Sequence, residues 1–277
     1  MMGAGPAGRG GWKRRFFRLL GPGLITGASD DDPSGIATFS QVGAQFGFAM
    51  AWVMLFSFPL MAAIQEISAR IGRVTGNGIA ANIRRHYPPW LLHGVVALVL
   101  VANIINLGAD LGAMGDALRL LIGGPQLLYV VGFGALCAGL EIFMRYRRYT
   151  ALLKWSTLTL FAYVGAALAL HLPWGEVLRS TVVPTLVLDT GYAVGVVAVF
   201  GTTISPYLFF WQSSQEAENE RSDPHARPLV RAPHQAPTEM QRIRIDTYLG
   251  MFLSNAIGWF ILVTVAATLH PSTFRPP

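Results

Sequence analysis

Charged residues are scarce in this sequence, and cysteine occurs only once. Only 13% of the 277 residues are Asp, Glu, Lys or Arg, whereas a soluble domain of this length carries roughly a quarter. The single cysteine, Cys137, lies inside an apolar run, so an intrachain disulfide is excluded and nothing points to an oxidising compartment. No His-Glu-X-X-His motif and no Ser/Lys dyad falls within an apolar segment, so the sequence does not indicate an enzyme.

Apolar residues take the place of the missing charges. They make up 52% of the chain, and the mean hydropathy is +0.44. Runs of about 20 apolar residues recur, which is the length that an α-helix needs to cross a hydrocarbon core of roughly 30 Å. We therefore predict an all-α polytopic membrane protein in a lipid bilayer, with about seven spanning helices. Their expected ranges are 17–47, 49–72, 91–117, 126–144, 151–171, 191–214 and 245–269.

The basic residues indicate how these helices are oriented. The net charge of +6 could suggest nucleic-acid binding, but the basic residues lie between apolar segments and do not line one surface. All of the 21 basic residues except Arg119, Arg179 and Arg275 fall on one side of the predicted membrane. That side is cytoplasmic by the positive-inside rule. We expect a bacterial inner-membrane protein with a cytoplasmic N-terminal segment at 1–16, a transmembrane domain at 17–269 and a cytoplasmic loop at 216–240.

Two of the predicted helices carry helix-breaking sequences near their middle. The first contains Asp-Asp-Asp-Pro-Ser-Gly at 30–35, and the sixth contains Gly-Thr-Thr-Ile-Ser-Pro at 201–206. Proline removes a backbone donor and blocks the preceding helical turn. Backbone groups left unpaired at membrane depth cost several kcal/mol each unless they line a cavity or meet a ligand. Paired broken helices are typical of a transporter site between inverted repeats, although ordinary proline kinks are common in spanning helices.

The carboxylate beside the first break is the main candidate for a ligand. A carboxylate near the bilayer centre costs at least about 2.5 kcal/mol, so it normally faces a cavity, a partner or an ion. No lysine or arginine lies at matching depth in a predicted helix to neutralise Asp32. A bound cation is therefore the natural counter-charge. We expect Asp31, one residue further from the break, to lie in the vestibule or to cap the half-helix.

These segments resemble the Nramp family of divalent metal transporters. The resemblance rests on Gly-Pro-Gly-Leu-Ile-Thr-Gly-Ala-Ser-Asp-Asp-Asp-Pro-Ser-Gly at 21–35, Ser-Ala-Arg-Ile-Gly at 68–72, Val-Thr-Gly at 74–76 and Gly-Thr-Thr-Ile-Ser-Pro at 201–206. It implies a leucine-transporter-like fold of two inverted five-helix repeats, which moves a divalent cation by alternating access without a cofactor. On that fold, the chain holds a whole first repeat at about 17–171 and an incomplete second one at about 191–269. A missing C-terminal half would then be a partner of this chain.

The metal-site motifs of the family are altered here. Its helix 1 motif is Asp-Pro-Gly-Asn, in which the aspartate and the asparagine ligate metal; Asp32 is kept, but Ser34 and Gly35 replace the last two residues. Ser205 stands where the family places a methionine thioether, and Thr202 where an alanine carbonyl binds the metal. The resemblance therefore implies a metal site at Asp32, Ser205, Thr202 and Gly35 made of hard oxygens. Such donors suit Mg²⁺, Ca²⁺ and Mn²⁺, and the substitutions resemble those of an Nramp-related branch that moves Mg²⁺.

Helix 3 of the family often carries Asp-Leu-Ala-Glu, whose acids are associated with proton movement. This chain has Asp110-Leu111-Gly112-Ala113, so the glutamate is lost and proton coupling is not implied. We regard Asp110 and Gln212 as residues of the ion pathway. For Gln212, and for Asn106 on helix 3, interhelical hydrogen bonding is an equal alternative.

The predicted function is transport of Mg²⁺, Mn²⁺ or Fe²⁺, with Asp32 as the main ligand. An alternative on the same fold is a carrier of amino acids or other organic solutes, which would hold a substrate carboxylate at free helix N-termini. Asp32 would repel such a carboxylate. A third hypothesis is a membrane protein without transport activity, but no signalling domain is attached.

Overall fold

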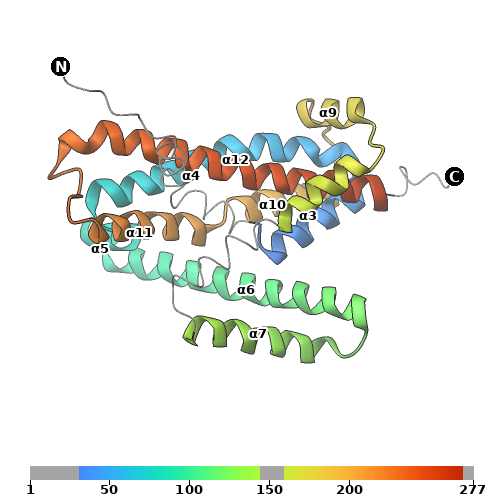
Figure 1. Cartoon of the computed structure of the whole chain (residues 1–277), viewed down its shortest axis with the longest axis horizontal. Helices are drawn as coiled ribbons and strands as arrows, with labels where there is room; N and C mark the ends of the chain where they lie inside the picture. Colours follow the sequence, from blue (N-terminus) through green and yellow to red (C-terminus); the bar gives the residue numbers. More distant parts are fainter. Residues whose placement is uncertain (1–30, 144–158, 271–277) are drawn as a thin grey trace, which may run out of the picture.

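The computed structural model describes residues 31–143 and 159–270, and every regular element within these ranges is helical (Figure 1). This agrees with the prediction of an all-α protein. The helices are α3 (Pro33–Phe46), α4 (Ala51–Thr75), α5 (Ile79–His86), α6 (Pro89–Ile122), α7 (Gln126–Phe143), α9 (Trp174–Val182), α10 (Thr190–Thr203), α11 (Pro206–Ser222) and α12 (Ala236–Leu269), with short 3₁₀ turns η1 (Gly47–Met50) and η2 (Pro233–Gln235). A further helical segment covers Thr159–Ala169.

Five helical stretches of the described residues are long and apolar enough to cross a membrane. They are Pro33–Thr75, Pro89–Ile122, Gln126–Phe143, Thr190–Ser222 and Pro233–Leu269. The first stretch contains two helices, because Gly47 with a φ of 59° ends α3. The shorter apolar helix Thr159–Ala169 falls in the fifth predicted span, of which residues 151–158 lie outside the described ranges. The described part of the chain is therefore a multi-pass membrane protein, as predicted.

The helix breaks follow from the local sequence. Asp32 caps the N-terminus of α3, and Pro33 occupies its first turn, where a missing N–H costs nothing. Helix α10 ends at Thr203, and α11 begins at Pro206. The break predicted in the sixth helix is thus confirmed. Residues 17–30 of the predicted first span lie outside the described residues.

The core lies where α3, α4, α10 and α12 meet. Phe39, Met54, Val199 and Ile261 contribute one buried apolar side chain from each of these helices. The backbones of α4 and α11 also approach closely, since a Cβ on Gly72 would lie 2.2 Å from the carbonyl oxygen of Ser213. Small residues of this kind let helix backbones pack together in membranes. The packing fixes the two half-helices of the sixth span against the rest of the bundle.

Helices α6 and α7 form a hairpin along one side of this bundle (Figure 1). Among the described residues, α6 has one buried residue, Gly115, and α7 has no buried residue. In a bilayer the exposed apolar side chains of α6 and α7 contact lipid or further helices, because lipid tails are as apolar as leucine.

The segment expected as a polar loop, 216–240, is shorter in the structure. Helix α11 continues to Ser222, and α12 begins at Ala236. Arg242 of α12 forms ion pairs with Glu216 of α11 and with Glu239 of its own helix, and this pairing allows the helices to continue where composition alone predicts a loop.

Candidate functional site

The carboxylate of Asp32 is held by the first turn of its own helix. Its Oδ1 accepts a hydrogen bond from the Gly35 N–H at 2.6 Å and another from the Ser34 hydroxyl at 2.8 Å. An aspartate in this position satisfies an unpaired backbone donor, and the helix N-terminus favours its negative charge. The local sequence Asp-Pro-Ser-Gly therefore orients the carboxylate.

The second oxygen of Asp32 connects two other helices. Its Oδ2 accepts from the Asn106 amide of α6 at 3.1 Å and from the Tyr207 hydroxyl of α11 at 2.9 Å. Tyr207 directly follows Pro206, where α11 begins. The start of α3 and the break before α11 therefore lie side by side, and one hydrogen bond joins them.

The sequence suggested an uncompensated charge at Asp32, and the structure supplies compensation of another kind. Within residues 31–143 and 159–270, no lysine or arginine forms an ion pair with Asp32. The carboxylate instead accepts four hydrogen bonds, which matches its roughly four lone-pair sites. Its charge is stabilised by protein donors and by the N-terminus of α3.

A second carboxylate belongs to the same cluster. Asp110 accepts from the backbone N–H of Ser34 at 2.9 Å and from the Asn106 amide at 3.3 Å. Asn106 and Asp110 are four residues apart on α6 and so lie on one face. The Asn106 amide therefore bridges the carboxylates of Asp32 and Asp110. We define the carboxylate cluster as Asp32, Ser34, Asn106, Asp110 and Tyr207.

The other two oxygen-bearing positions suggested by the family motif lie at the second break. The Ser205 hydroxyl donates to the carbonyl oxygens of Thr202 at 2.9 Å and Gly201 at 3.2 Å. It thereby satisfies carbonyls at the C-terminal end of α10, which would otherwise lack a helical partner. The described residues show no hydrogen bond from Ser205 or Thr202 to Asp32.

The remaining predicted residues occupy two places, the start of α3 and the middle of α11. Gly35 lies in the first turn of α3 and gives its N–H to Asp32. Asp31 directly precedes Asp32 and is buried, with 8% of its surface exposed. Gln212 is buried further along α11, five residues after Tyr207.

Sequence reasoning missed Tyr207 and left Asn106 undecided. The available signal for Tyr207 was its place directly after a proline at a helix break, where a polar side chain can reach a site between the half-helices. The signal for Asn106 was its spacing of four residues from Asp110. Ser34 was noted only as a departure from a family motif, yet both its N–H and its hydroxyl contribute to the carboxylate cluster.

The chemistry of the carboxylate cluster is that of hard oxygens. In the part of the chain that the structure describes, no three or more His, Cys, Asp or Glu side chains gather as a metal-binding group. The cluster offers carboxylate, amide, hydroxyl and phenol oxygens, and no sulfur. Because Asn106 and Tyr207 carry an acceptor oxygen as well as a donor, either can turn from donating to Asp32 to facing a cation.

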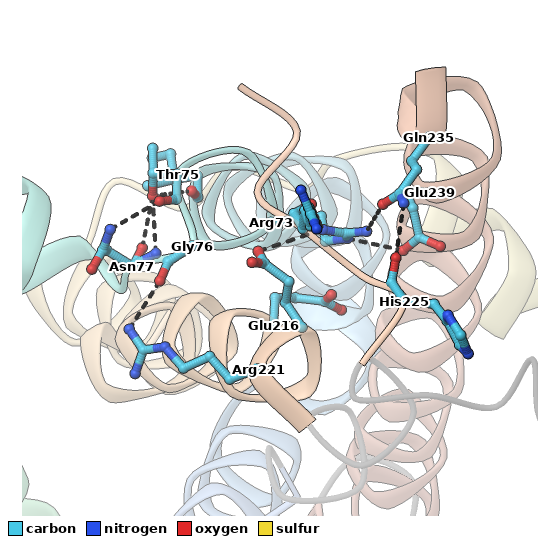
Figure 2. Close-up of polar contacts among 12 residues, drawn as sticks. Arg73, Thr75, Gly76, Asn77, Glu216, Arg221, His225, Gln235 and Glu239 are labelled. Atoms are coloured by element: carbon cyan, nitrogen blue, oxygen red, sulfur yellow. Dashed lines mark hydrogen bonds and ion pairs between the residues drawn. The ribbon is translucent and has the colours of Figure 1, made fainter. Parts of the chain in front are cut away.

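A separate ionic network joins α4, α11 and α12 (Figure 2). Its centre is Arg73 of α4, whose surface is 3% exposed. The Arg73 guanidinium donates to Glu239 of α12 at 3.1 Å, to Gln235 at 3.1 Å and to the carbonyl oxygen of Arg227 at 2.7 Å. It also lies 3.4 Å from a carboxylate oxygen of Glu220 of α11. One buried cation thus joins α4, α11, α12 and the chain between them.

A second arginine extends this network. Arg242 of α12 pairs with the buried Glu216 of α11 at 2.5 Å and with Glu239 at 3.1 Å. Glu239 therefore lies between Arg73 and Arg242. Together these contacts bind α11, the second half of the broken helix, to α4 and α12 at the end remote from Tyr207.

Comparison with known proteins gives one family. The family model described as natural resistance-associated macrophage protein-like, Nramp, matches residues 23–275. The divalent metal cation transporter MntH of Klebsiella pneumoniae is 30% identical over 259 residues, covering 91% of this chain and 59% of that protein. The protein of the same name from Acidiphilium cryptum is 24% identical over 277 residues, covering 96% and 60%. The chain therefore spans about 60% of the length of these curated relatives.

Solved structures show the same fold. A mutant of the manganese transporter of Eremococcus coleocola superimposes with a TM-score of 0.75 at 20% sequence identity, covering 96% of this chain and 54% of that one. The same transporter with a bound aromatic bis-isothiourea compound gives a TM-score of 0.70 at 18% identity. The likeness confirms the leucine-transporter-like fold expected from the sequence.

Proposed function

This chain belongs to the Nramp family, and on that premise we propose that it forms part of a transporter of divalent metal cations with Asp32 as the main ion ligand. The relatives named above are divalent metal cation transporters or manganese transporters. The chain spans about 60% of the curated relatives, so alternating access is proposed for the whole transporter and not for these residues alone.

One observation carries the proposal. The Tyr207 hydroxyl lies 2.9 Å from Asp32 Oδ2, so a carboxylate at one helix break meets the residue beside the other break. In inverted-repeat transporters, ions bind where two broken helices meet near the bilayer midplane. No basic side chain of the described residues occupies this place beside Asp32.

The cation approaches Oδ2 of Asp32. Oδ1 is committed to the Gly35 N–H, which the helix fixes, whereas Oδ2 is bonded to two side chains from other helices. Rotation of the Asn106 amide and the Tyr207 hydroxyl turns two donors into two oxygen ligands. Ser205, Thr202 and Gly35 supply further oxygen near the breaks, and Asp110, Gln212 and Asp31 belong to the path of the ion.

The donor set favours hard ions. Carboxylate, amide and hydroxyl oxygens suit Mg²⁺ and Mn²⁺ more than ions that prefer sulfur ligands, so we place Mg²⁺ and Mn²⁺ ahead of Fe²⁺. An organic carrier would use a free helix N-terminus for a substrate carboxylate. The N-terminus of α3 is already capped by Asp32, which disfavours that alternative.

We also propose a cellular location and a membrane orientation for the protein. The protein lies in a bacterial inner membrane, with residues 1–16 in the cytoplasm and a transmembrane domain over 17–269. The ends of α4, α11 and α12 that carry Arg73, Arg221 and Arg242 lie together in the structure, which supports a common side for these basic residues.

Uptake measurements test the role of Asp32. Cells expressing the whole transporter of which this chain forms part are assayed for Mn²⁺ and Mg²⁺ accumulation, and Asp32→Ala should abolish the increase over untransformed cells. Asp189→Ala is the matched control, because Asp189 caps α10 by accepting from the Tyr192 N–H at 3.2 Å. Both changes remove a helix cap worth about 0.5–2 kcal/mol. If Asp32→Ala accumulates metal as well as Asp189→Ala does, Asp32 is not the ligand.

A further inference from the structure

A groove lies between the short helix α5 and the start of α6, away from the carboxylate cluster. It has a volume of about 370 Å³ and is lined by Ala80, Ala81, Arg84, Leu92, His93 and Val96. Each helix contributes residues spaced i, i+1 and i+4, which form one continuous face. The alanines of α5 are small, and this leaves the groove open beside the larger side chains of α6.

The groove has a basic part and an apolar part. Arg84 and His93 are exposed, and each helix supplies one of them. Leu92 and Val96 are one helical turn apart on α6 and line the apolar part. This arrangement matches a ligand that is an anion at one end and a hydrocarbon at the other.

No acidic side chain of the described residues forms an ion pair with Arg84 or His93. The sequence has no Asp or Glu between Glu66 and Asp110. Arg70 and Arg73 are paired with carboxylates, but Arg84 forms no ion pair with the described residues. The groove therefore carries positive charge that is available to an external anion.

The corner between α5 and α6 indicates the depth of the groove. Tyr87 is 57% exposed and Trp90 is 73% exposed, on either side of Pro88 and Pro89. Exposed aromatic residues gather at membrane–water interfaces, where the lipid headgroups lie. Basic pockets between helices at this level bind acidic lipid headgroups.

We propose that the α5–α6 groove binds an acidic phospholipid. The phosphate lies against Arg84 and His93, and the start of an acyl chain lies along Leu92 and Val96. A free phosphate would leave the apolar part of the groove uncovered, and a zwitterionic lipid would bring its own positive charge toward Arg84. This site is independent of the ion site, because its lining shares no residue with the carboxylate cluster.

Native mass spectrometry of the purified 277-residue chain tests the proposal. The chain in detergent is titrated with phosphatidylglycerol, with phosphatidylcholine of the same acyl chains, and with inorganic phosphate. Phosphatidylglycerol should be retained at one site in preference to the other two. Arg84→Gln should weaken its binding about fivefold, the effect expected for one basic residue near a membrane surface. His93→Gln should weaken it in the same direction.

Arg85→Gln is the matched control, since it removes the same charge from the adjacent exposed residue outside the groove lining. It should leave phosphatidylglycerol binding within about twofold of the original. Ala81→Phe fills the groove without changing charge and should abolish the preference. Circular dichroism verifies that each variant keeps its helices. Equal binding of the two lipids, equal effects of Arg84→Gln and Arg85→Gln, or inorganic phosphate binding as tightly as the acidic lipid would each overturn the proposal.

Discussion

Replacing Arg73 by methionine removes the centre of the ionic network while keeping an apolar side chain of similar length. The change leaves Glu220, whose side chain is 5% exposed, without the arginine that lies 3.4 Å away. It also removes donors from Glu239 and from the Arg227 carbonyl oxygen. Breaking a buried ion pair by deleting one partner costs about 3–5 kcal/mol. We expect Arg73→Met to lower the free energy of unfolding by that amount.

Arg70→Met provides the comparison on the same helix. Arg70 pairs with Glu66 one turn away, but its side chain is 48% exposed. The Glu66 side chain is 11% exposed, and a helical pair of this spacing with an exposed arginine contributes about 0.3–0.5 kcal/mol. The two variants therefore lose the same kind of group and differ mainly in burial and in the number of partners.

Thermal unfolding in detergent, followed by tryptophan fluorescence, measures the difference. For a domain of this size, the expected losses correspond to a lowering of the midpoint by roughly 6–20 °C for Arg73→Met and roughly 1–2 °C for Arg70→Met. Adding Glu220→Gln to Arg73→Met should restore part of the loss, because it removes the buried charge left behind. Equal midpoints for the two single variants, without any restoration by Glu220→Gln, would refute the assignment of Arg73 as the centre of the network.

Two further changes test packing and the ion site. Gly72→Ala should destabilise the protein by about 1–3 kcal/mol, because the new methyl group would lie 2.2 Å from the Ser213 carbonyl oxygen. Gly139→Ala is the control and should not destabilise the protein, because its methyl group meets open space. Thermal unfolding compares the two variants. Tyr207→Phe should weaken Mn²⁺ binding by at least about 10- to 100-fold, because it removes the hydroxyl that holds Asp32 Oδ2 and that turns to the ion in the proposed site. Tyr129→Phe, which removes a hydroxyl bonded to Gly123 far along the chain, should leave the calorimetric affinity unchanged.

The helix breaks could be predicted because their causes are local. Pro33 and Pro206 each remove a backbone donor. Asp32 caps α3 through its side chain, and Ser205 is the N-cap residue of α11 without a side-chain capping bond. Asp32 could be selected as the candidate ligand for the same reason, since its place beside a break in an apolar segment is visible in the sequence alone.

The partners of Asp32 could not be predicted in this way. Asn106 and Tyr207 lie 74 and 175 residues further along the chain, and they reach the carboxylate only after three helices have packed together. Hydrophobic periodicity places helices but does not fix their rotation about their axes, and rotation decides which side chains meet. The role of Arg73 was hidden for a similar reason. In the sequence it was counted only toward the predicted cytoplasmic side, and its burial among Glu220, Glu239 and Gln235 reveals a structural function.

Metal binding to the purified chain tests the central claim most directly. Isothermal titration with Mn²⁺ and Mg²⁺ compares the original chain with Asp32→Asn and Asp189→Asn. Asparagine is as good a helix cap as aspartate, so both substitutions keep their helix starts and remove only a charge. We expect Asp32→Asn to weaken binding more than about 100-fold, beyond the usual effect of losing an outer-shell group, while Asp189→Asn binds as the original chain does. Unchanged binding by Asp32→Asn would contradict the account, because the carboxylate between the two helix breaks would then not hold the ion.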